Sequence, residues 1–302
     1  MGPTAAGKSA LALGIAREAD AEIVSCDSLQ VYRGLDIGSA KPTKEERDVV
    51  PHHLIDVVDP DESFSAADYA RLGRQALASI ASRARISVVV GGTGLYLQAL
   101  LFGLFEGPGR NPTLRRRLTR IADRYGHDRL HRMLARVDPA AASRVASRDR
   151  VRVIRALEVY RATGRTLSEH HRRHSSRPRA SSGFATLVVG VAPDRATLRT
   201  RVERRTEAMF EAGLLDEVSG LLARGYHGGL PAMRAIGYRQ AVAVVRGEIG
   251  AAEARRDIVR ETMRYAKRQM TWFRHRSGAT WTSSADQARD VVLAWLAGSV
   301  ER

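Results

Sequence analysis

The chain has 302 residues, of which 44% are hydrophobic and 27% charged, so its length and composition are those of a folded globular protein with a sizeable core. Its net charge of +16 comes mostly from arginine, which indicates a polyanionic partner such as nucleic acid unless an Arg-rich genome composition explains it. One cysteine, Cys26, excludes an intramolecular disulfide and a cysteine-rich zinc site, and we expect a cytoplasmic protein with neither a membrane span nor a signal peptide, since apolar runs are short.

Helices and buried strands alternate in the first third of the chain. Residues 86–90 (ISVVV) form a continuous apolar, β-branched run, as expected of a parallel strand that is covered on both faces. This alternation predicts an α/β fold, a P-loop-type parallel sheet flanked by helices. The predicted helices are 10–18, 65–84 and one from Leu95, and the predicted strands are 21–26, 54–58 and 86–90.

A turn-rich hinge at 107–112 (GPGRNP) interrupts this pattern. Residues 113–174 are helical in pattern and rich in arginine, and a Ser/Pro/Arg linker follows at 175–183. We therefore predict an all-α insertion domain over 113–183 within an α/β core that comprises 1–112 and 184–302. In the second part of the core we expect a strand over 184–191, helices to about Arg276, a short strand over 279–282 and a final helix.

The segment from Gly2 to Ser9 matches the P-loop pattern G-x-x-x-x-G-K-[ST] in every position. Its glycines allow backbone N–H groups to face phosphate oxygens, and the helix that follows adds the positive end of its dipole. Lys8 would neutralise phosphate charge, and the Ser9 hydroxyl would bind Mg²⁺, the one cofactor that we expect. By itself the loop predicts ATP binding. The candidate phosphate-binding residues are Gly2, Pro3, Thr4, Ala5, Ala6, Gly7, Lys8 and Ser9.

Two features depart from a P-loop NTPase. Such a loop normally follows a buried strand, yet only Met1 precedes it, so we expect the first strand to be missing through a misplaced start or a truncation. The strand 86–90 runs into a Gly-Gly-Thr-Gly turn and lacks the terminal Asp that positions Mg²⁺ in those enzymes. The Asp at a strand end is instead Asp27, which is suited to act as a general base on a substrate nucleophile.

These segments resemble those of bacterial tRNA dimethylallyltransferases, in the same order along the chain. The resemblance covers nearly the whole sequence and implies transfer of a dimethylallyl group from dimethylallyl diphosphate to N6 of the adenosine 3′ of the anticodon in tRNA, with release of diphosphate. It is carried by GPTAAGKS, SCDSLQVYRGLDIGSAKP, PHHLIDVVDP, VVVGGTGLYLQALLFG, RVIRALEVYRATG, RAIGYRQ and YAKRQMTWFR.

The resemblance also implies roles for single residues. Asp27 would accept the amine proton, and Arg205 would neutralise the departing diphosphate. Thr93 would contact the leaving group or the target nucleotide, and Gln30 would recognise the adenine after it is flipped out of the anticodon loop. The residues implied in tRNA binding are Asp27, Ser28, Leu29, Gln30, Thr93, Arg115, Arg152, Arg155, Arg234, Gly237, Tyr238, Arg239, Lys267, Arg268, Gln269, Thr271, Trp272 and Arg274.

Helical periodicity over 256–273 supports an RNA-binding helix without reference to any family. One face is apolar, and a second stripe is basic and free of acids, which suits a row of phosphates. Trp272 fits a core position better than a stacking position. The apolar face comprises Val259, Met263, Ala266, Met270 and Phe273, and the basic stripe comprises Arg256, Arg260, Arg264, Lys267, Arg268, Thr271 and Arg274.

Other interpretations stay open at this point. A P-loop kinase of a small metabolite explains the loop and Asp27, but not the basic helix. A nucleic-acid-binding NTPase explains the charge, but not the missing metal-binding Asp. An adenylate isopentenyltransferase acts on a free nucleotide, which needs neither the Arg-rich insertion nor the basic helix. Asp27 as a helix cap, Thr93 as a turn residue and Arg205 as part of a solvated face are the structural alternatives. We favour a monomeric tRNA prenyltransferase.

Overall fold

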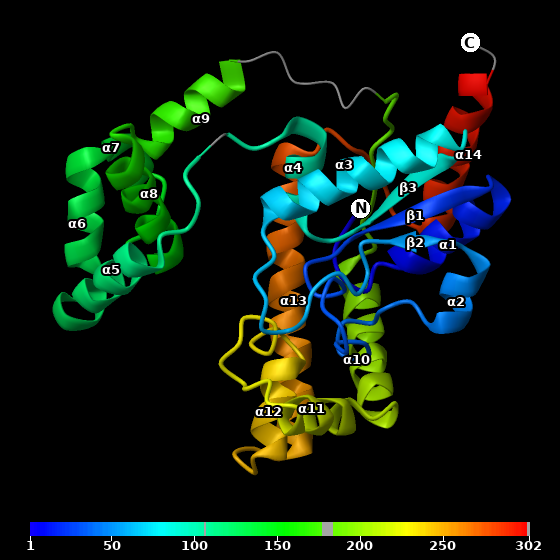
Figure 1. The fold of residues 1–302 in the computed structure, drawn as a ribbon. Helices are drawn as coiled ribbons and strands as arrows, with labels where there is room; N and C mark the ends of the chain where they lie inside the picture. The colour runs from blue at the N-terminus through cyan, green and yellow to red at the C-terminus, as the bar shows by residue number, and fades with distance from the viewer. Residues whose placement is uncertain (106, 177–183, 301–302) are drawn as a thin grey trace. The chain divides into compact units, whose positions relative to one another are not determined.

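The computed structural model describes residues 1–105, 107–176 and 184–300 (Figure 1). The chain forms two compact units, one of Met1–Leu101 with Phe184–Arg302 and the other of Phe102–Gly183. The insertion thus begins at Phe102 rather than at residue 113, because the hinge packs with the helical unit: Arg155 donates a hydrogen bond to the Pro108 carbonyl. Most of the predicted linker over 175–183 lies outside the described residues.

A three-stranded parallel sheet forms the centre of the first unit, in the order β2 (His52–His53), β1 (Ala21–Cys26), β3 (Ile86–Gly91). Helix α1 (Lys8–Glu18) packs on one face, where Ala21 and Ile23 point. Helices α3 (Ala66–Ser82) and α4 (Gly94–Phe102) pack on the other face, where Val24 and Cys26 point. Strand β1 is therefore buried on both faces, and both predicted strands, 21–26 and 86–90, are confirmed.

The predicted strand over 54–58 is wrong. Leu54 and Asp56 have φ angles of 63° and 55°, in the left-handed region, where an extended strand cannot continue. The pairing with β1 is made instead by the two residues just before this segment, and they follow a short helix that sequence reasoning missed. This helix, α2 (Lys44–Val49), begins with a capping box formed by Thr43 and Glu46.

The second sheet has two parallel strands, β4 (Val189–Val191) and β5 (Thr280–Thr282), covered by α14 (Ala285–Val300). Strand β4 is shorter than predicted because β5 offers only three residues to pair with. The backbone of Met1 lies beside β4: its amino group donates to the Val189 carbonyl at 2.7 Å, and the Val191 N–H donates to the Met1 carbonyl at 2.9 Å. The described residues therefore enter the Gly2–Ser9 loop from a position next to this sheet.

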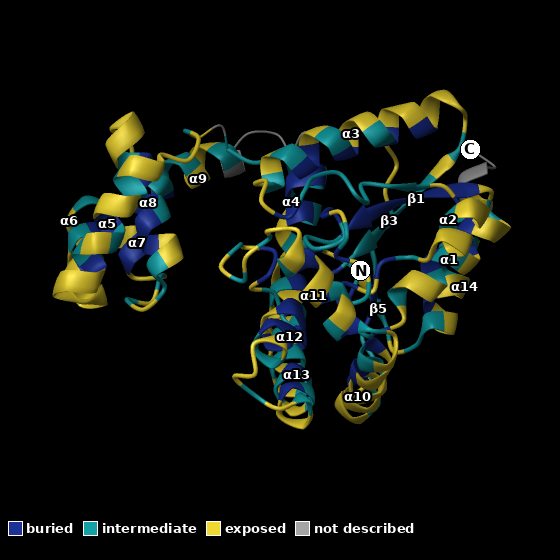
Figure 2. Cartoon of the chain, turned by 60° about the horizontal axis from the view of Figure 1, so that its bottom comes forward, coloured by how far each residue is buried: buried dark blue, intermediate teal, exposed yellow. Residues whose placement is uncertain are grey.

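Four helices complete the first unit: α10 (Arg195–Glu211), α11 (Leu214–Ala223), α12 (Tyr238–Val245) and α13 (Ala251–Arg276). In Figure 2 the buried residues lie along the inner sides of α12 and α13, and the outer side of α10 is exposed. A core cluster joins α11 and α12 to the segment 31–35 that follows β1. The cluster thereby ties the chain after β1 to helices that come about 180 residues later.

The regular elements of the second unit's described part are all helices, as the sequence predicts. Its core is formed by Leu118, Leu130, Leu134, Val153 and Leu157, among others. None of the helices among the described residues of either unit combines the length and the hydropathy that crossing a membrane requires. The helices are α5 (Pro112–Tyr125), α6 (His127–Val137), α7 (Pro139–Ala142), α8 (Arg150–Thr163) and α9 (Leu167–Ser176).

Candidate active site

The Gly2–Ser9 loop folds around the start of α1. Gly7 is the residue before the helix and has a φ of 88°, in the region that favours glycine. Gly2 lies so close to β4 that an added Cβ would stand 2.3 Å from the Val191 carbonyl oxygen. The Lys8 ammonium donates to the Pro3 carbonyl at 2.6 Å. The loop thus has the compact, glycine-dependent form that phosphate binding at a helix N-terminus requires.

Two helices from the second half of the chain, α10 and α13, hold this loop. From α13, the Gln269 side-chain oxygen accepts a hydrogen bond from the Thr4 backbone N–H at 2.9 Å. From α10, Arg205 donates to the Thr4 hydroxyl at 3.1 Å, and Arg201 donates to the Ala6 carbonyl at 3.3 Å. Arg205 is therefore placed at the loop, where the prediction for a diphosphate-binding arginine needs it.

The Gly91-Gly92-Thr93-Gly94 turn lies against the same helix α13. The Gln269 amide nitrogen donates to the Gly92 carbonyl at 2.8 Å, and a Cβ at Gly92 would stand only 2.4 Å from that nitrogen. A Cβ at Gly94 would stand 2.3 Å from the Trp272 ring. Gln269 is buried and joins the turn to the Gly2–Ser9 loop, so its structural role is clear, and Trp272 packs on the start of α4.

Asp27 and Thr93 meet where β1 and β3 end. The Thr93 N–H donates to the Cys26 carbonyl at 3.1 Å, and its hydroxyl oxygen accepts from the Ser28 N–H at 3.0 Å. The Asp27 carboxylate accepts from the Leu29 N–H at 2.8 Å, which orients it at the head of a tight turn. Neighbouring parallel strands thus bring together two candidate residues that are 66 positions apart.

The charges at the loop and at the strand ends affect one another. The pKa of Lys8 is lowered to about 8, chiefly by burial; the Asp27 charge opposes this change, and the Arg205 charge adds to it. Burial also lowers the pKa of the Arg205 guanidinium, and the Asp27 charge opposes that change. Two cations and one carboxylate therefore lie within electrostatic reach of one another.

Tyr265 belongs to this site and was missed by sequence reasoning. Burial, together with the charge of Asp27, raises its pKa to about 12, and its side chain hydrogen-bonds with that of Gln269. The sequence contains a signal for this residue, because Tyr265 begins the YAKRQ segment and precedes Gln269 by one helical turn. Its raised pKa keeps it a neutral hydroxyl within electrostatic reach of Asp27.

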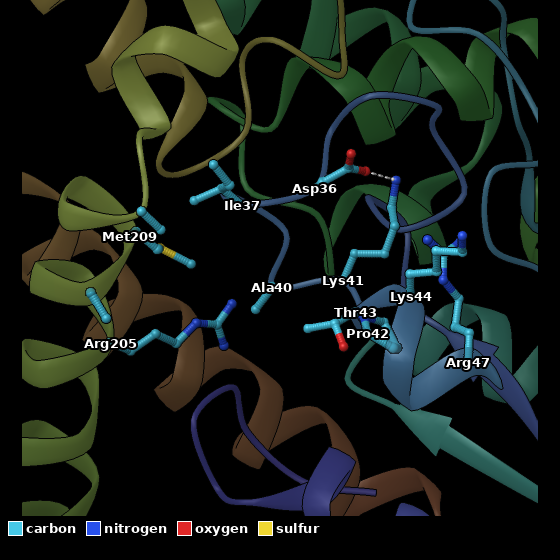
Figure 3. A pocket seen from close by; sticks show the side chains of 12 residues that line it. Asp36, Ile37, Ala40, Lys41, Pro42, Thr43, Lys44, Arg47, Arg205 and Met209 are labelled. Carbon is cyan, nitrogen blue, oxygen red and sulfur yellow. Dashed lines mark hydrogen bonds and ion pairs between the residues drawn. The ribbon is translucent and has the colours of Figure 1, made fainter. Parts of the chain in front are cut away.

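A cavity of about 440 Å³ adjoins Arg205 (Figure 3). Arg205 and Met209 face it from α10, and Ala40 and Thr43 face it from the opposite segment. Lys41, only 2% exposed, forms part of its wall and bonds with Asp56 at 2.6 Å and with Asp36. The sequence did not reveal this cavity, which is connected to the Gly2–Ser9 loop through Arg205 and its bond with Thr4.

The Gln30 amide is fixed on both sides. Its oxygen accepts from the Ser25 hydroxyl at 2.8 Å, and its nitrogen donates to the Ala40 carbonyl at 3.0 Å. Because both ends of an amide then have defined partners, its orientation is set before a substrate arrives. That Gln30 reads the adenine stays a prediction.

The basic stripe of α13 is exposed along its whole length, as the periodicity predicts. Two of its arginines nevertheless contact acids off the stripe: Arg260 pairs with Asp257 at 2.7 Å, and Arg264 pairs with Glu261 at 3.5 Å. Four residues of the stripe are predicted to bind tRNA, and all four are exposed: Lys267, Arg268, Thr271 and Arg274.

The predicted apolar face of α13 is partly wrong. The buried positions are Ala254, Ile258, Ala266, Gln269 and Phe273. By contrast, Val259, Met263 and Met270 line a groove of about 1220 Å³ between α10 and α13, together with several arginines and Lys267. The buried face differs from the predicted one because α13 packs against both α10 and α12, so its contact surface is wider than one stripe.

The RAIGYRQ segment divides into exposed and buried residues. Arg234 and Arg239 are exposed and accessible to a tRNA. Gly237 is buried, and Tyr238 has no exposed surface, its hydroxyl donating to the Glu217 carboxylate at 2.7 Å. In this conformation the Tyr238 side chain cannot contact tRNA, because it is enclosed in the core.

In the helical unit, two of the three candidate arginines are engaged with a buried acid. Arg115 contacts both carboxylate oxygens of Glu158 at 2.8 Å, and Arg155 contacts one at 2.7 Å, while Glu158 itself has no exposed surface. Burial alone would raise the pKa of Glu158, but these hydrogen bonds outweigh it and hold the pKa at about 2. The third, Arg152, has a side chain that is 74% exposed and pairs with Asp149 at 3.2 Å.

The Ser9 hydroxyl is the metal ligand that the loop pattern predicts. Among the described residues, no group of three or more His, Cys, Asp or Glu side chains is arranged to hold a metal. Ser9 is exposed at the start of α1, next to Lys8. Such a site fits Mg²⁺ bound by one hydroxyl, by phosphate oxygens and by water, since Mg²⁺ keeps several of its waters.

Comparison with known proteins gives a consistent result. The sequence model of the family described as IPP transferase matches residues 30–276, a range that begins after the Gly2–Ser9 loop and Asp27. A tRNA dimethylallyltransferase of Anaeromyxobacter dehalogenans (strain 2CP-1) is 49% identical over 280 residues, covering 93% of this chain and 90% of that protein.

Solved structures agree with this. The full-length tRNA isopentenylpyrophosphate transferase of Bacillus halodurans superimposes with a TM-score of 0.71 at 37% identity, covering 99% of this chain and 95% of that one. A eukaryotic dimethylallyltransferase acting on tRNA superimposes with a TM-score of 0.73 at 27% identity, covering 90% of this chain and 68% of that one.

Proposed function

Because this chain belongs to the IPP transferase family and is a tRNA dimethylallyltransferase, we propose how its residues divide the reaction. The Gly2–Ser9 loop holds the diphosphate of dimethylallyl diphosphate, and the target is N6 of the adenosine 3′ of the anticodon. The observation that carries this assignment is the meeting of Lys8, Arg205 and Asp27 around the loop. A kinase or a free-nucleotide prenyltransferase has no comparable support among the relatives.

The transfer needs one bond to form and one to break. The N6 amine attacks the allylic carbon of the donor, the carbon–oxygen bond to diphosphate breaks, and the amine loses a proton. Asp27 accepts that proton, since its carboxylate is held at the turn after β1 by the Leu29 N–H. Lys8 and Arg205 neutralise the charge that develops on the departing diphosphate.

Magnesium fits the same loop. Ser9 would hold it together with diphosphate oxygens, and the ion would add positive charge to the leaving group when bound. Thr93 hydrogen-bonds the Ser28 N–H and so supports the Asp27 turn, and Gln30 presents its fixed amide to the adenine. The residues proposed to surround the attacking amine thus come from the segments that follow β1 and β3.

The exposed cations are proposed to bind the tRNA backbone. They are Arg152 in the helical unit, Arg234 and Arg239 before and in α12, and the stripe of α13 that includes Lys267 and Arg274. We also propose a cytoplasmic, monomeric enzyme; the buried thiol of Cys26, the one cysteine of the sequence, supports the cytoplasmic location.

The test is transfer of label from dimethylallyl diphosphate to unmodified tRNA with Mg²⁺, with Asp27→Asn as the informative variant. Loss of the base should reduce kcat by about 10²–10⁴-fold while the Kd for tRNA changes little. The Asp123→Asn variant, in an exposed pair with Arg150, is the control. Equal losses of rate and of tRNA affinity would show that Asp27 serves binding rather than proton transfer.

A further inference from the structure

A loop of residues 36–41 joins the active site to α11. Its first three backbone N–H groups converge on one carboxylate: Glu217 accepts from Asp36 at 3.0 Å, from Ile37 at 2.7 Å and from Gly38 at 3.4 Å. Successive N–H groups that point inward form a concave anion-binding site, which here is filled by a side chain of the same protein. Glu217 therefore holds one end of the 36–41 loop.

Tyr238 completes this end of the loop. Its hydroxyl donates to Glu217 at 2.7 Å, and its ring lies so close to Gly38 that an added Cβ would stand 2.6 Å from ring carbons. Burial and the charge of Glu217 raise the pKa of Tyr238, so it remains a neutral donor. The carboxylate has four donors, three from the backbone and one phenol, and its position is closely determined.

The other end of the same loop holds Gln30. The carbonyl oxygens of Ser39 and Ala40 accept from the Gln30 amide nitrogen at 3.5 and 3.0 Å. The loop is stiff between its two ends, because the Ala40 N–H donates to the Ile37 carbonyl and the Lys41 N–H to the Asp36 carbonyl, both at 3.0 Å. A displacement at Glu217 is therefore transmitted to the carbonyls that orient the Gln30 amide.

We propose that Glu217 is a positioning residue for adenine recognition: through the 36–41 loop it sets the orientation of the Gln30 amide. This inference rests on the proposed function, because the orientation of Gln30 affects catalysis only if an adenine is read there. Glu217 itself touches neither substrate. Through Glu217, the buried Tyr238 of the RAIGYRQ segment would support the DSLQ segment, although about 210 residues separate the two segments.

A double-mutant cycle separates positioning from general stability. Glu217→Gln replaces one acceptor oxygen with an amide NH₂ group, which can only donate. This group would face backbone N–H donors, so the loop must shift. We expect kcat/KM for tRNA to fall about tenfold, the size of coupling found within one hydrogen-bond network. In a Gln30→Ala background, the same change should lower kcat/KM by less than about twofold, because the group that it positions is already gone.

Leu221→Ala is the matched control, since Leu221 is a fully buried apolar residue of the same helix. It should lower the Tm, and its effect on kcat/KM should be the same with and without Gln30. If Glu217→Gln fails to fold, Tyr238→Phe removes one donor to the carboxylate and keeps the ring packed on Gly38. It should show the same coupling to Gln30, with a smaller loss of about threefold.

The inference is overturned if either variant lowers kcat/KM equally in both backgrounds, because Glu217 would then act independently of Gln30. Failure of the proposed function would look different. In that case the wild-type protein, folded and supplied with dimethylallyl diphosphate, Mg²⁺ and tRNA, would transfer no label.

Discussion

Arginines of the two units look alike in the sequence but have different surroundings. Arg205 of α10 lies at the Gly2–Ser9 loop, bonded to the Thr4 hydroxyl, with burial lowering its pKa. Arg115 and Arg155 of the helical unit lie against Glu158, whose carboxylate has no exposed surface. The first cation is held near a phosphate-binding loop, and the other two are neutralised within their own core.

The difference teaches that a buried carboxylate can keep an arginine for the protein's own core, so that its charge is no longer offered to a polyanion. Glu158 accepts from two guanidinium groups and from the Asn111 N–H, so this cluster organises the hinge of the helical unit. Arg205 instead bonds a neutral hydroxyl, so its charge remains to attract an incoming anion. Each of the following predictions tests one side of this contrast.

Among the changes that test this contrast, the largest effect is expected from Arg205→Ala. Removing a preorganised cation from the leaving group should lower kcat by about 10²–10³-fold, as the loss of one such group commonly does. Arg204→Ala, at an exposed position on the same helix, should leave kcat within about twofold. Single-turnover transfer of labelled donor gives both numbers, and similar values for the two variants would remove Arg205 from the reaction.

Glu158→Gln should unfold the helical unit more easily without touching the chemistry. Removing one partner of a buried ion pair costs about 3 kcal/mol, so the Tm and the urea midpoint should both fall. Asp123→Asn, in an exposed pair with Arg150, should cost less than about 1 kcal/mol. Equal stability losses would show that Glu158 is not the organising charge of this unit.

The same carboxylate has a defined pH dependence. Its pKa lies at about 2 in the folded protein, below the ordinary value of 4.5. The stabilisation from Glu158 is therefore complete above pH 4.5 and is lost as the pH falls toward 2, because the unfolded state binds the proton first. Acid unfolding of wild type and Glu158→Gln should converge in this range, and a constant difference down to pH 2 would contradict the assignment.

Donor binding should weaken as the pH rises through about 8. Lys8 has its pKa lowered to about 8 by burial and by the Arg205 charge, with Asp27 opposing, so above that pH the free enzyme loses the charge that diphosphate needs. Each further pH unit should raise the Kd for diphosphate by up to about tenfold, measured by calorimetry. Lys8→Arg stays cationic, so any pH dependence that it retains belongs to diphosphate itself.

The smallest effect concerns the exposed stripe. Lys267→Ala should weaken tRNA binding modestly and reduce the slope of log K against log salt by about one. Arg289→Ala changes an exposed arginine of α14 that pairs with Glu18 and should leave the slope unchanged. An unaltered slope for Lys267→Ala would exclude that lysine from the tRNA interface.

Local patterns in the sequence determined a large part of this protein. The Gly2–Ser9 loop, the strands 21–26 and 86–90, the strand-end Asp27 and the exposed stripe of α13 all follow from short-range spacing and periodicity. These features depend on residues within a few positions of one another, so a linear reading can detect them. The error at 54–58 came from backbone turns at Leu54 and Asp56 that an apolar run does not reveal.

Only the tertiary structure decided which side chains are free to act. Gln269 bridges the loop and the Gly-Gly-Thr turn, Glu217 holds the 36–41 loop, and Glu158 neutralises Arg115 and Arg155. The partners in these contacts are separated by up to 265 positions in the sequence. Glu158 is also fully buried, which a count of the charged residues does not show. A residue type and its spacing state what a side chain can do, whereas its partners in three dimensions settle what it does.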